Sequence, residues 1–231
     1  MPIYRLTDSL AFPDPQGAED GIVAVGGDLS PDRLIRAYQV GIFPWYNIDE
    51  PILWWSPDPR CVLYPSNLRI SKSMHQILNQ KPFSVSFDKD FKSVMKACAE
   101  VRYKDRTGTW INDEMIESYT QVHRKGLAHS VEVRNRQGEL VGGLYGLSMG
   151  SCFFGESMFH KVSNASKYAF IALVKNLAER SFKLIDCQVY NPHLESLGAI
   201  NISRAEFLKQ LKINLKDTSY IGSWKDWQFN Q

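Results

Sequence analysis

A carboxylate and an amide stand close together on a segment whose other residues are apolar. Across residues 183 to 189, strand-like alternation places Asp186 and Gln188 on one face and the apolar side chains on the other. Such polar groups cost several kcal/mol when they are buried without partners. They are therefore expected either to line a cleft, where the acid can orient the amide, or to form a satisfied polar pair inside the protein.

A second charged side chain belongs to a neighbouring strand. Glu156 follows Gly155 and shares a face with Met158 by the same alternation. A glycine inside a strand often marks a bulge or the close approach of another backbone. Three more glycines in the preceding strand fit either a sheet opened for a ligand or simple curvature: Gly142, Gly143 and Gly146.

Tryptophans gather in the N-terminal quarter and beside one later helix: Trp45, Trp54, Trp55 and Trp110. Two such rings can sandwich a nucleobase, and each stacking contact contributes about 1 to 3 kcal/mol. Core packing is the usual role of tryptophan, so we assign a functional role to only one or two of the rings.

Other common chemistries lack their motifs. The sequence contains no HExxH motif and no phosphate-binding glycine loop, and its GxSxG string, Gly146-Leu-Ser-Met-Gly150, falls between two predicted strands instead of before a helix, so no nucleophile elbow is predicted. Its four cysteines include no CxxC pair, which indicates neither a zinc site nor a disulfide framework. Cys187 is predicted to face away from the polar pair, so we reject it as a nucleophile. No metal site is predicted.

Composition indicates a globular protein. The chain has 231 residues, of which 44% are hydrophobic, and this is enough to bury a core. A formal net charge of +2 argues against wholesale coating of nucleic acid but leaves room for a local basic patch. No apolar run approaches the roughly 18 residues of a membrane helix, and the N-terminus does not resemble a secretion signal, so a cytoplasmic protein is expected.

The predicted elements change in character along the chain. Residues 1–62 are rich in Pro, Gly and Trp and predict a small, mostly irregular N-terminal domain with one helix, capped by Ser30 and ended by Gly41. Residues 63–231 predict a second, regular domain. Its helices are expected from Ser71, after Asp88, over 112–126, over 164–180 and after Ser203, and its strands over 83–87, 129–134, 139–148, 151–159 and 183–189.

This order predicts an α+β protein in which helices flank a mixed, mostly antiparallel sheet, similar to the N-acetyltransferase fold. Acetyl-CoA enzymes of that fold cradle a pyrophosphate on a glycine-rich turn before the long helix. The corresponding segment, residues 159–166, contains no glycine. A CoA donor is therefore not expected.

Seven short motifs in order resemble the bacterial leucyl/phenylalanyl-tRNA–protein transferases, and together they span nearly the whole chain. They are Gly26-Gly-Asp-Leu-Ser-Pro31, Gly41-Ile-Phe-Pro-Trp45, Pro51-Ile-Leu-Trp-Trp-Ser-Pro-Asp-Pro-Arg60, Gly108-Thr-Trp-Ile111, Gly155-Glu-Ser-Met-Phe159, Asn164-Ala-Ser-Lys167 and Leu184-Ile-Asp-Cys-Gln188.

The resemblance implies an N-end-rule enzyme of the cytoplasm that uses neither metal nor CoA. It would take Leu or Phe, less readily Met, from leucyl-tRNA or phenylalanyl-tRNA. The acceptors would be proteins that begin with Arg or Lys, and the product would be a degradation signal. A small N-terminal domain and an acetyltransferase-like catalytic domain are also implied.

The resemblance also implies roles for individual residues. Asp186 and Gln188 would be catalytic, with Gln188 oriented by Asp186 to hold the attacking amine, and Glu156 would bind the acceptor's cation. The remaining roles fall on Trp45 and Trp110 for the terminal adenosine, on Leu144, Phe153, Met158 and Leu173 for the transferred side chain, and on Arg60, Arg69, Lys72 and Lys81 for the tRNA backbone.

One of these assignments requires an irregular strand. Simple alternation puts Phe153 and Met158 on opposite faces, so either a bulge lies at Gly155 or one of the two is misassigned. Two rival functions also remain at this point: a CoA-dependent N-acetyltransferase, which the element order favours, and a non-catalytic RNA-binding module, which the tryptophans favour.

Overall fold

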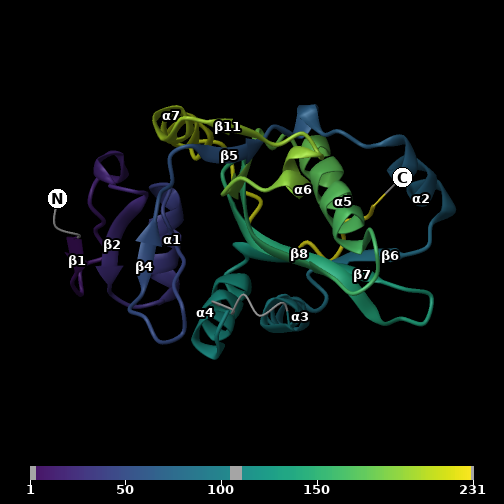
Figure 1. The fold of residues 1–231 in the computed structure, drawn as a ribbon, viewed down its shortest axis with the longest axis horizontal. Coiled ribbons are helices and arrows are strands. Elements are labelled where there is room, and N and C mark those ends of the chain that lie inside the picture. Colours follow the sequence, from purple (N-terminus) through teal and green to yellow (C-terminus); the bar gives the residue numbers. More distant parts are fainter. Residues whose placement is uncertain (1–3, 105–110, 230–231) are drawn as a thin grey trace.

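Two β-sheets stand side by side in the computed structural model, which describes residues 4–104 and 111–229 (Figure 1). The smaller sheet has four strands in the order β1-β2-β4-β3, and only β1 and β2 run parallel. Its elements are β1 (Tyr4–Leu6), β2 (Ile22–Gly26), β3 (Phe43–Pro44) and β4 (Leu53–Trp55), with helix α1 (Pro31–Gln39) between β2 and β3.

The larger sheet has seven strands in the order β11-β5-β10-β9-β8-β7-β6. All neighbours are antiparallel except β9 and β10, which run parallel. The strands are β5 (Arg60–Leu63), β6 (Ser84–Phe87), β7 (Ala128–Arg134), β8 (Leu140–Met149), β9 (Cys152–His160), β10 (Leu184–Gln188) and β11 (Ile200–Ile202).

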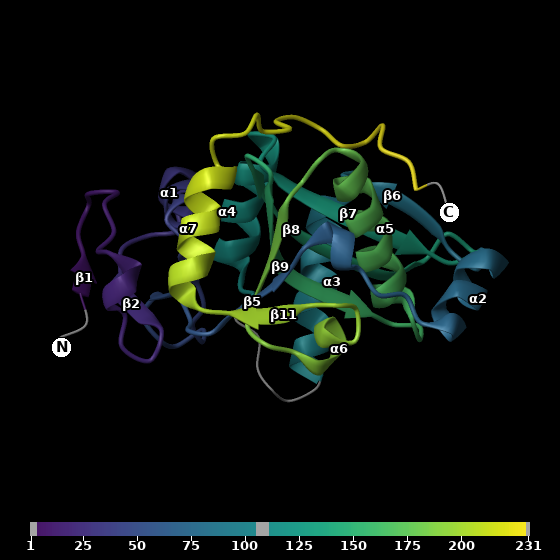
Figure 2. The ribbon, with the colours of Figure 1, turned by 90° about the horizontal axis from the view of Figure 1, so that it is seen from above.

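Helices cover both faces of the larger sheet. In Figure 1, α3 (Phe91–Lys104) and α4 (Asp113–Arg124) lie below β8, whereas α5 (Ala165–Glu179) lies above it and connects β9 to β10. Figure 2 shows α2 (Lys72–Gln80) at the end of the molecule opposite the small sheet. Two further helices, α6 (Pro192–Glu195) and α7 (Arg204–Asn214), follow β10. No helix among the described residues is long and apolar enough to cross a membrane.

Most predicted helix starts carry the caps that their sequences indicate. The side chains of Ser71, Asn112 and Ser203 each accept a hydrogen bond from a backbone N–H in the first turn of the following helix. Ser30 is different, because its side chain caps nothing. Instead, the Asp28 carboxylate accepts a hydrogen bond from the Ser30 backbone N–H at 2.7 Å and pairs with Arg33 inside the first turn.

The α+β class is confirmed, and so is the mostly antiparallel mixed sheet flanked by helices. The N-terminal part is more regular than predicted, because its strands are too short to show an alternating pattern. The predicted boundary after residue 62 would cut through β5, which pairs with β10 and β11 of the larger sheet. The change from one sheet to the other falls instead in residues 56–59, between β4 and β5.

One hydrophobic core joins the two sheets. Buried side chains from the small sheet and α1 pack in the same cluster as side chains from α4, β9 and α7. Tyr38 of α1, for example, packs against Phe154 of β9 with ring centroids 5.3 Å apart. A second cluster on the other face of the larger sheet contains the apolar side of α5. The small sheet is therefore anchored by packing against the buried side chains of the larger domain.

Candidate active site

The two parallel strands at the centre of the larger sheet separate partway along their length. β9 and β10 pair only from Leu184 opposite Cys152 to Asp186 opposite Phe154. Beyond that point the register is irregular between β10 and β5 and between β9 and β8. The side chains that follow the split therefore border a pocket between the strands.

The irregularity in β9 is a bulge at Glu156. Tyr145 of β8 pairs with Ser157, and the next residue, Gly146, pairs with Gly155, so Glu156 is the extra residue. Gly146 has no room for a side chain, since a Cβ there would lie 2.1 Å from the Phe154 carbonyl oxygen. Of the two alternatives that the sequence left open, a bulge near Gly155 or a misassigned residue, the bulge is therefore present.

The other β8 glycines also serve close packing. A Cβ on Gly142 would lie 2.6 Å from the Cβ of Ala165, at the start of α5, and one on Gly143 would lie 2.6 Å from the Val131 carbonyl oxygen. Neither glycine opens the sheet for a ligand. Together they let α5 and β7 approach the strand closely.

The irregularity in β10 falls between the two predicted catalytic residues. Asp186 pairs with Val62 of β5, and Gln188 pairs with Cys61, which leaves Cys187 as the extra residue. Gln188 adopts a left-handed backbone conformation with φ of 62°. The predicted simple alternation is therefore wrong here, because a bulge turns Gln188 independently of Asp186.

Asp186 is fully buried and paired with a cation. The Arg60 guanidinium donates two hydrogen bonds to its carboxylate, at 2.7 and 2.6 Å, and Arg60 is itself fully buried. The same carboxylate accepts a hydrogen bond from the backbone N–H of Gln188 at 2.9 Å. Asp186 thus secures the backbone of the bulge, whereas the side chain of Gln188 has another partner.

That partner is Glu156. The Gln188 amide nitrogen donates to one Glu156 oxygen at 2.6 Å, and the Tyr119 hydroxyl donates to the other at 3.1 Å. Tyr119 is also bonded to the Tyr38 hydroxyl of α1 at 2.6 Å. The prediction that Asp186 orients the Gln188 side chain is therefore wrong, because Glu156 holds the NH₂ group of that side chain. The carbonyl oxygen of the Gln188 side chain can then accept a hydrogen bond from a ligand.

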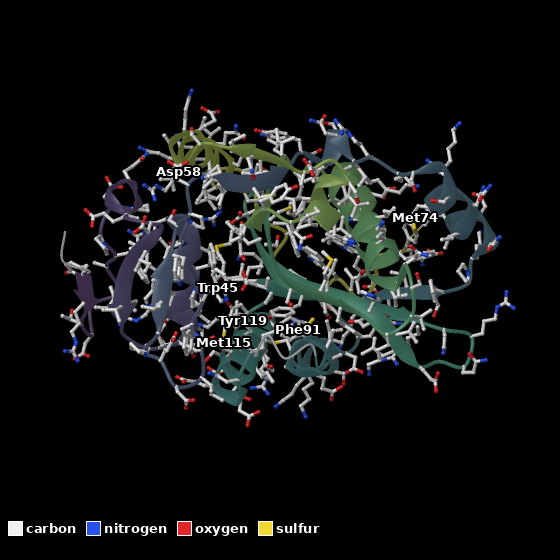
Figure 3. The ribbon with its side chains drawn as sticks, in the orientation of Figure 1. Trp45, Asp58, Met74, Phe91, Met115 and Tyr119 are labelled. Carbon is white, nitrogen blue, oxygen red and sulfur yellow. The ribbon has the colours of Figure 1, made fainter. Side chains whose placement is uncertain are left out.

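The pocket between the strands has a volume of about 280 Å³. Gln188, Glu156 and Asp186 border it together with Trp45, which is 39% exposed. In the view of Figure 3, Trp45 is labelled between the small sheet and β8. The apolar wall of the pocket includes all four residues predicted for a transferred side chain, Leu144, Phe153, Met158 and Leu173, and also Phe170, Ile185 and Leu194. Trp110 lies outside the described residues.

The predicted basic residues are not gathered in one place. Arg60 cannot meet a tRNA phosphate, because it is buried between the rings of Phe43 and Phe207 and committed to Asp186. That prediction is wrong. The remaining three are exposed, lie on or beside α2 and do not line the pocket: Arg69, Lys72 and Lys81.

Burial sets the charge of the polar cluster. It raises the pKa of Glu156 to about 7, although hydrogen bonds from Tyr38, Tyr119 and Gln188 oppose the rise. Burial, followed by the Glu156 charge, raises the pKa of Tyr119 well above its usual value. Tyr119 therefore stays a protonated donor, while Glu156 changes charge near neutral pH.

The raised pKa of Glu156 makes stability depend on pH. A carboxyl whose pKa rises on folding, here from 4.5 to about 7, favours the fold below the unfolded pKa, and this contribution is lost as pH rises through 7. We expect Glu156→Gln to gain roughly 3 kcal/mol relative to wild type between pH 4.5 and 8. Urea unfolding at both pH values measures the gain. A difference between the two proteins that stays constant with pH would contradict the assignment.

Sequence models of known families match both parts of the chain. The family described as leucyl/phenylalanyl-tRNA protein transferase matches residues 62–212, and the N-terminal domain of the same family matches residues 27–58.

Curated relatives match over nearly the full length. A leucyl/phenylalanyl-tRNA–protein transferase from Pseudomonas putida (strain W619) is 55% identical over 229 residues, covering 97% of this chain and 100% of the relative. One of the same name from Desulfatibacillum aliphaticivorans is 53% identical over 225 residues, covering 97% and 96%. The solved structure of L-PGS from Bacillus licheniformis aligns with a TM-score of 0.42 and 9% identity over 68% of this chain and 50% of that one.

The family matches and relatives, on a domain with an open pocket between diverging strands, define an aminoacyltransferase. The chain belongs to the leucyl/phenylalanyl-tRNA–protein transferase family.

Sequence reasoning missed three contributors to the polar cluster. Tyr38 and Tyr119 occur at apolar positions of predicted helices, where a hydroxyl gives no separate indication of function. Arg60 follows Pro59 in a segment predicted to be irregular. An unpaired acid on a buried strand does require a cation, and a search for one among the arginines beside short apolar runs could have found Arg60.

Proposed function

We propose that this chain transfers Leu or Phe, and less readily Met, from aminoacyl-tRNA to the α-amine of proteins that begin with Arg or Lys. The product would be a degradation signal, and the reaction would take place in the cytoplasm. The observation that carries the proposal is one pocket in which an apolar wall of Leu144, Phe153, Met158 and Leu173 ends at the Gln188–Glu156 pair.

The apolar wall fits the transferred amino acid. A pocket lined by aliphatic, aromatic and thioether side chains selects by shape and apolar area, so it accepts Leu and Phe and discriminates only weakly against Met. Phe153 and Met158 reach the same pocket only because the bulge at Glu156 reverses the alternation of β9. The same irregularity thus supplies the wall and the acid beside it.

Gln188 is placed to position the attacking amine. Because its NH₂ group donates to Glu156, its carbonyl oxygen can accept a hydrogen bond from the amine. The amine has a pKa of about 7.7 to 8, so a sizeable fraction is already free base at neutral pH. The new C–N bond forms as the ester C–O bond breaks, and the amine proton ends on the ribose oxygen that leaves. The ester is already activated, so catalysis here is mainly positioning.

Glu156 is our candidate for reading the acceptor's cation. It is 9% exposed and borders the pocket, and no described Lys or Arg forms an ion pair with it. An acceptor that begins with Arg or Lys would supply the missing positive charge, which would favour the ionised carboxylate.

The terminal adenosine of the tRNA would lie on the side of the pocket that faces the small sheet, and the tRNA backbone would extend from there toward α2. Trp45 borders the pocket there and presents an exposed ring for the terminal adenosine. We retain Trp110 as a proposed second ring and Arg69, Lys72 and Lys81 as proposed backbone contacts.

A transfer assay tests the function. Purified protein is incubated with radiolabelled leucyl-tRNA and an Arg-initiated peptide, and label is expected in the peptide. Acetyl transfer from acetyl-CoA would support an N-acetyltransferase instead, and tRNA that is bound but not consumed would support an RNA-binding module. Either result without labelled peptide contradicts the proposal.

Removing the Glu156 charge should relax acceptor choice. We expect Glu156→Gln to lower kcat/KM for an Arg-initiated peptide by about 10- to 100-fold, the cost of losing one charged hydrogen bond. A peptide that begins with citrulline, which has the same shape without the charge, should lose much less. The ratio of the two kcat/KM values is the measurement. An unchanged ratio would place cation recognition elsewhere.

A further inference from the structure

Two thiols lie opposite each other beside the catalytic strand. Cys61 of β5 pairs directly with Gln188, and Cys187 is the extra residue of the β10 bulge at the same level. Each thiol shifts the pKa of the other, so the two side chains interact. In a bulge two residues of one strand oppose a single residue of the other, so Cys187 and Gln188 both oppose Cys61. Residues opposed across antiparallel strands have Cα atoms roughly 4.5 to 5.5 Å apart, and a disulfide spans roughly 4.4 to 6.8 Å. The bulge thus brings two cysteines within reach of a covalent bond.

The pair differs from the other two cysteines in its access to solvent. Cys187 is half-buried and borders the pocket, so a small oxidant that enters the pocket meets its sulfur. Cys98 and Cys152 are buried in the other core, and burial raises the pKa of Cys152 to about 12. The Cys187 thiol lowers the pKa of Cys61, whereas the Cys61 thiol and burial raise the pKa of Cys187 well above its usual value, so Cys61 is the member of the pair that more readily becomes a thiolate.

Both thiols are neighbours of the groups that shape the site. Cys61 follows Arg60, which pairs with Asp186, and Cys187 lies between Asp186 and Gln188. A disulfide requires an S–S distance of about 2.05 Å, much shorter than a hydrogen bond between thiols. We expect the closing of that distance to draw Cys187 toward β5 and to turn the adjoining Gln188, so that its amide leaves Glu156.

We propose that Cys61 and Cys187 are a reversible redox switch, in which a peroxide joins them as a disulfide and stops aminoacyl transfer. The Cys187 thiol gives its proton to the Cys61 thiolate, and the Cys187 sulfur then attacks peroxide, so that an S–O bond forms, the O–O bond breaks and, with a proton from solvent, water leaves. The Cys61 sulfur then attacks the sulfenic acid, forming the S–S bond and releasing a second water. In total, two thiols lose two electrons and two protons, and one hydrogen peroxide becomes two waters. The loss of activity rests on the proposed function, whereas the bond itself does not.

The test uses the full-length protein and hydrogen peroxide. Peptide mapping under non-reducing conditions should find Cys61 and Cys187 in one cross-linked peptide pair that has lost two hydrogen atoms. The leucine transfer rate, measured before and after treatment, should fall by about 100-fold, which is the order of loss for reacting groups misplaced by about 1 Å. Dithiothreitol should restore both the thiols and the rate.

Two variants separate this bond from other oxidation. Cys61→Ala should keep its transfer rate through the same treatment, whereas a double variant with Cys98→Ala and Cys152→Ala should lose it as wild type does. If no Cys61–Cys187 peptide forms, or if Cys61→Ala is inactivated equally, the switch is disproved. A chain that cross-links but shows no transfer before treatment would overturn the proposed function and the switching of activity, and would leave only the bond. Should Cys61→Ala fail to fold, peptide mapping of the wild type still decides whether the bond forms.

Discussion

Asp186→Ala is expected to destabilise the protein by about 3 to 5 kcal/mol, because it leaves the Arg60 guanidinium buried without a counter-charge. Both side chains of the pair are at most 1% exposed, so water cannot take the place of the lost carboxylate. The variant also loses the acceptor for the Gln188 backbone N–H. Denaturant unfolding at pH 7 measures the loss. A change below 1 kcal/mol would mean that the pair carries little of the fold's stability.

A paired replacement separates the charge from the shape. Arg60→Met combined with Asp186→Leu removes both ions together, and buried ion pairs replaced by apolar residues are often neutral for stability. We expect this double variant to recover most of the loss. Its transfer rate should stay low nonetheless, since the Gln188 N–H still lacks the carboxylate that holds the bulge. A recovered rate would show that the bulge forms without Asp186.

Gln188→Ala is expected to lower kcat by about 100-fold, the order of effect that follows when a reacting group is no longer held in place. KM for leucyl-tRNA should change little, because the apolar wall and Trp45 are untouched. Since the Gln188 hydrogen bond lowers the pKa of Glu156, the variant should also raise that pKa above 7. Steady-state kinetics on folded protein, with a pH titration of stability, measure both effects.

Gln210 offers a matched control for Gln188. It is a partly buried glutamine of α7 whose amide bonds to Tyr64 and Glu206, outside the residues that line the pocket. Gln210→Ala should leave kcat unchanged. If it lowers kcat as much as Gln188→Ala does, the loss reflects general loosening of the fold and Gln188 has no positioning role.

The regular part of the fold was predictable because its information is local. The helices that begin after Ser71 and Asn112 combine a cap, an apolar stripe and a stop, and each of these is visible within one or two turns of sequence, whereas the helix after Ser203 shows its cap. The short strands β2 and β4 have no such periodicity. They are strands because they pair with each other, which is a contact between residues about 30 positions apart.

Gln188, Glu156 and the apolar wall could be named in advance, but their arrangement and their partners Tyr38, Tyr119 and Arg60 could not. Period-two alternation fails at both bulges, and a bulge depends on its partner strand as much as on its own residues. Gly146, for example, leaves the space that the Glu156 bulge needs, although it lies on a different strand. The same limit explains Arg60. An arginine seen from its own neighbours resembles a surface cation, and only the fold brings it to Asp186.

The core that joins the two sheets determines whether either part of the chain can be transferred to another protein on its own. Trp54 and Tyr38 are fully buried, and Tyr38 lies against Phe154 on the far side of the 56–59 connection. If the chain were cut at that connection, the N-terminal part would expose its apolar side chains to water. The C-terminal part would lose the side chains that cover α4. The N-terminal region is therefore not a portable module. A gene fusion that grafted either part onto a foreign neighbour would have to bring the other with it.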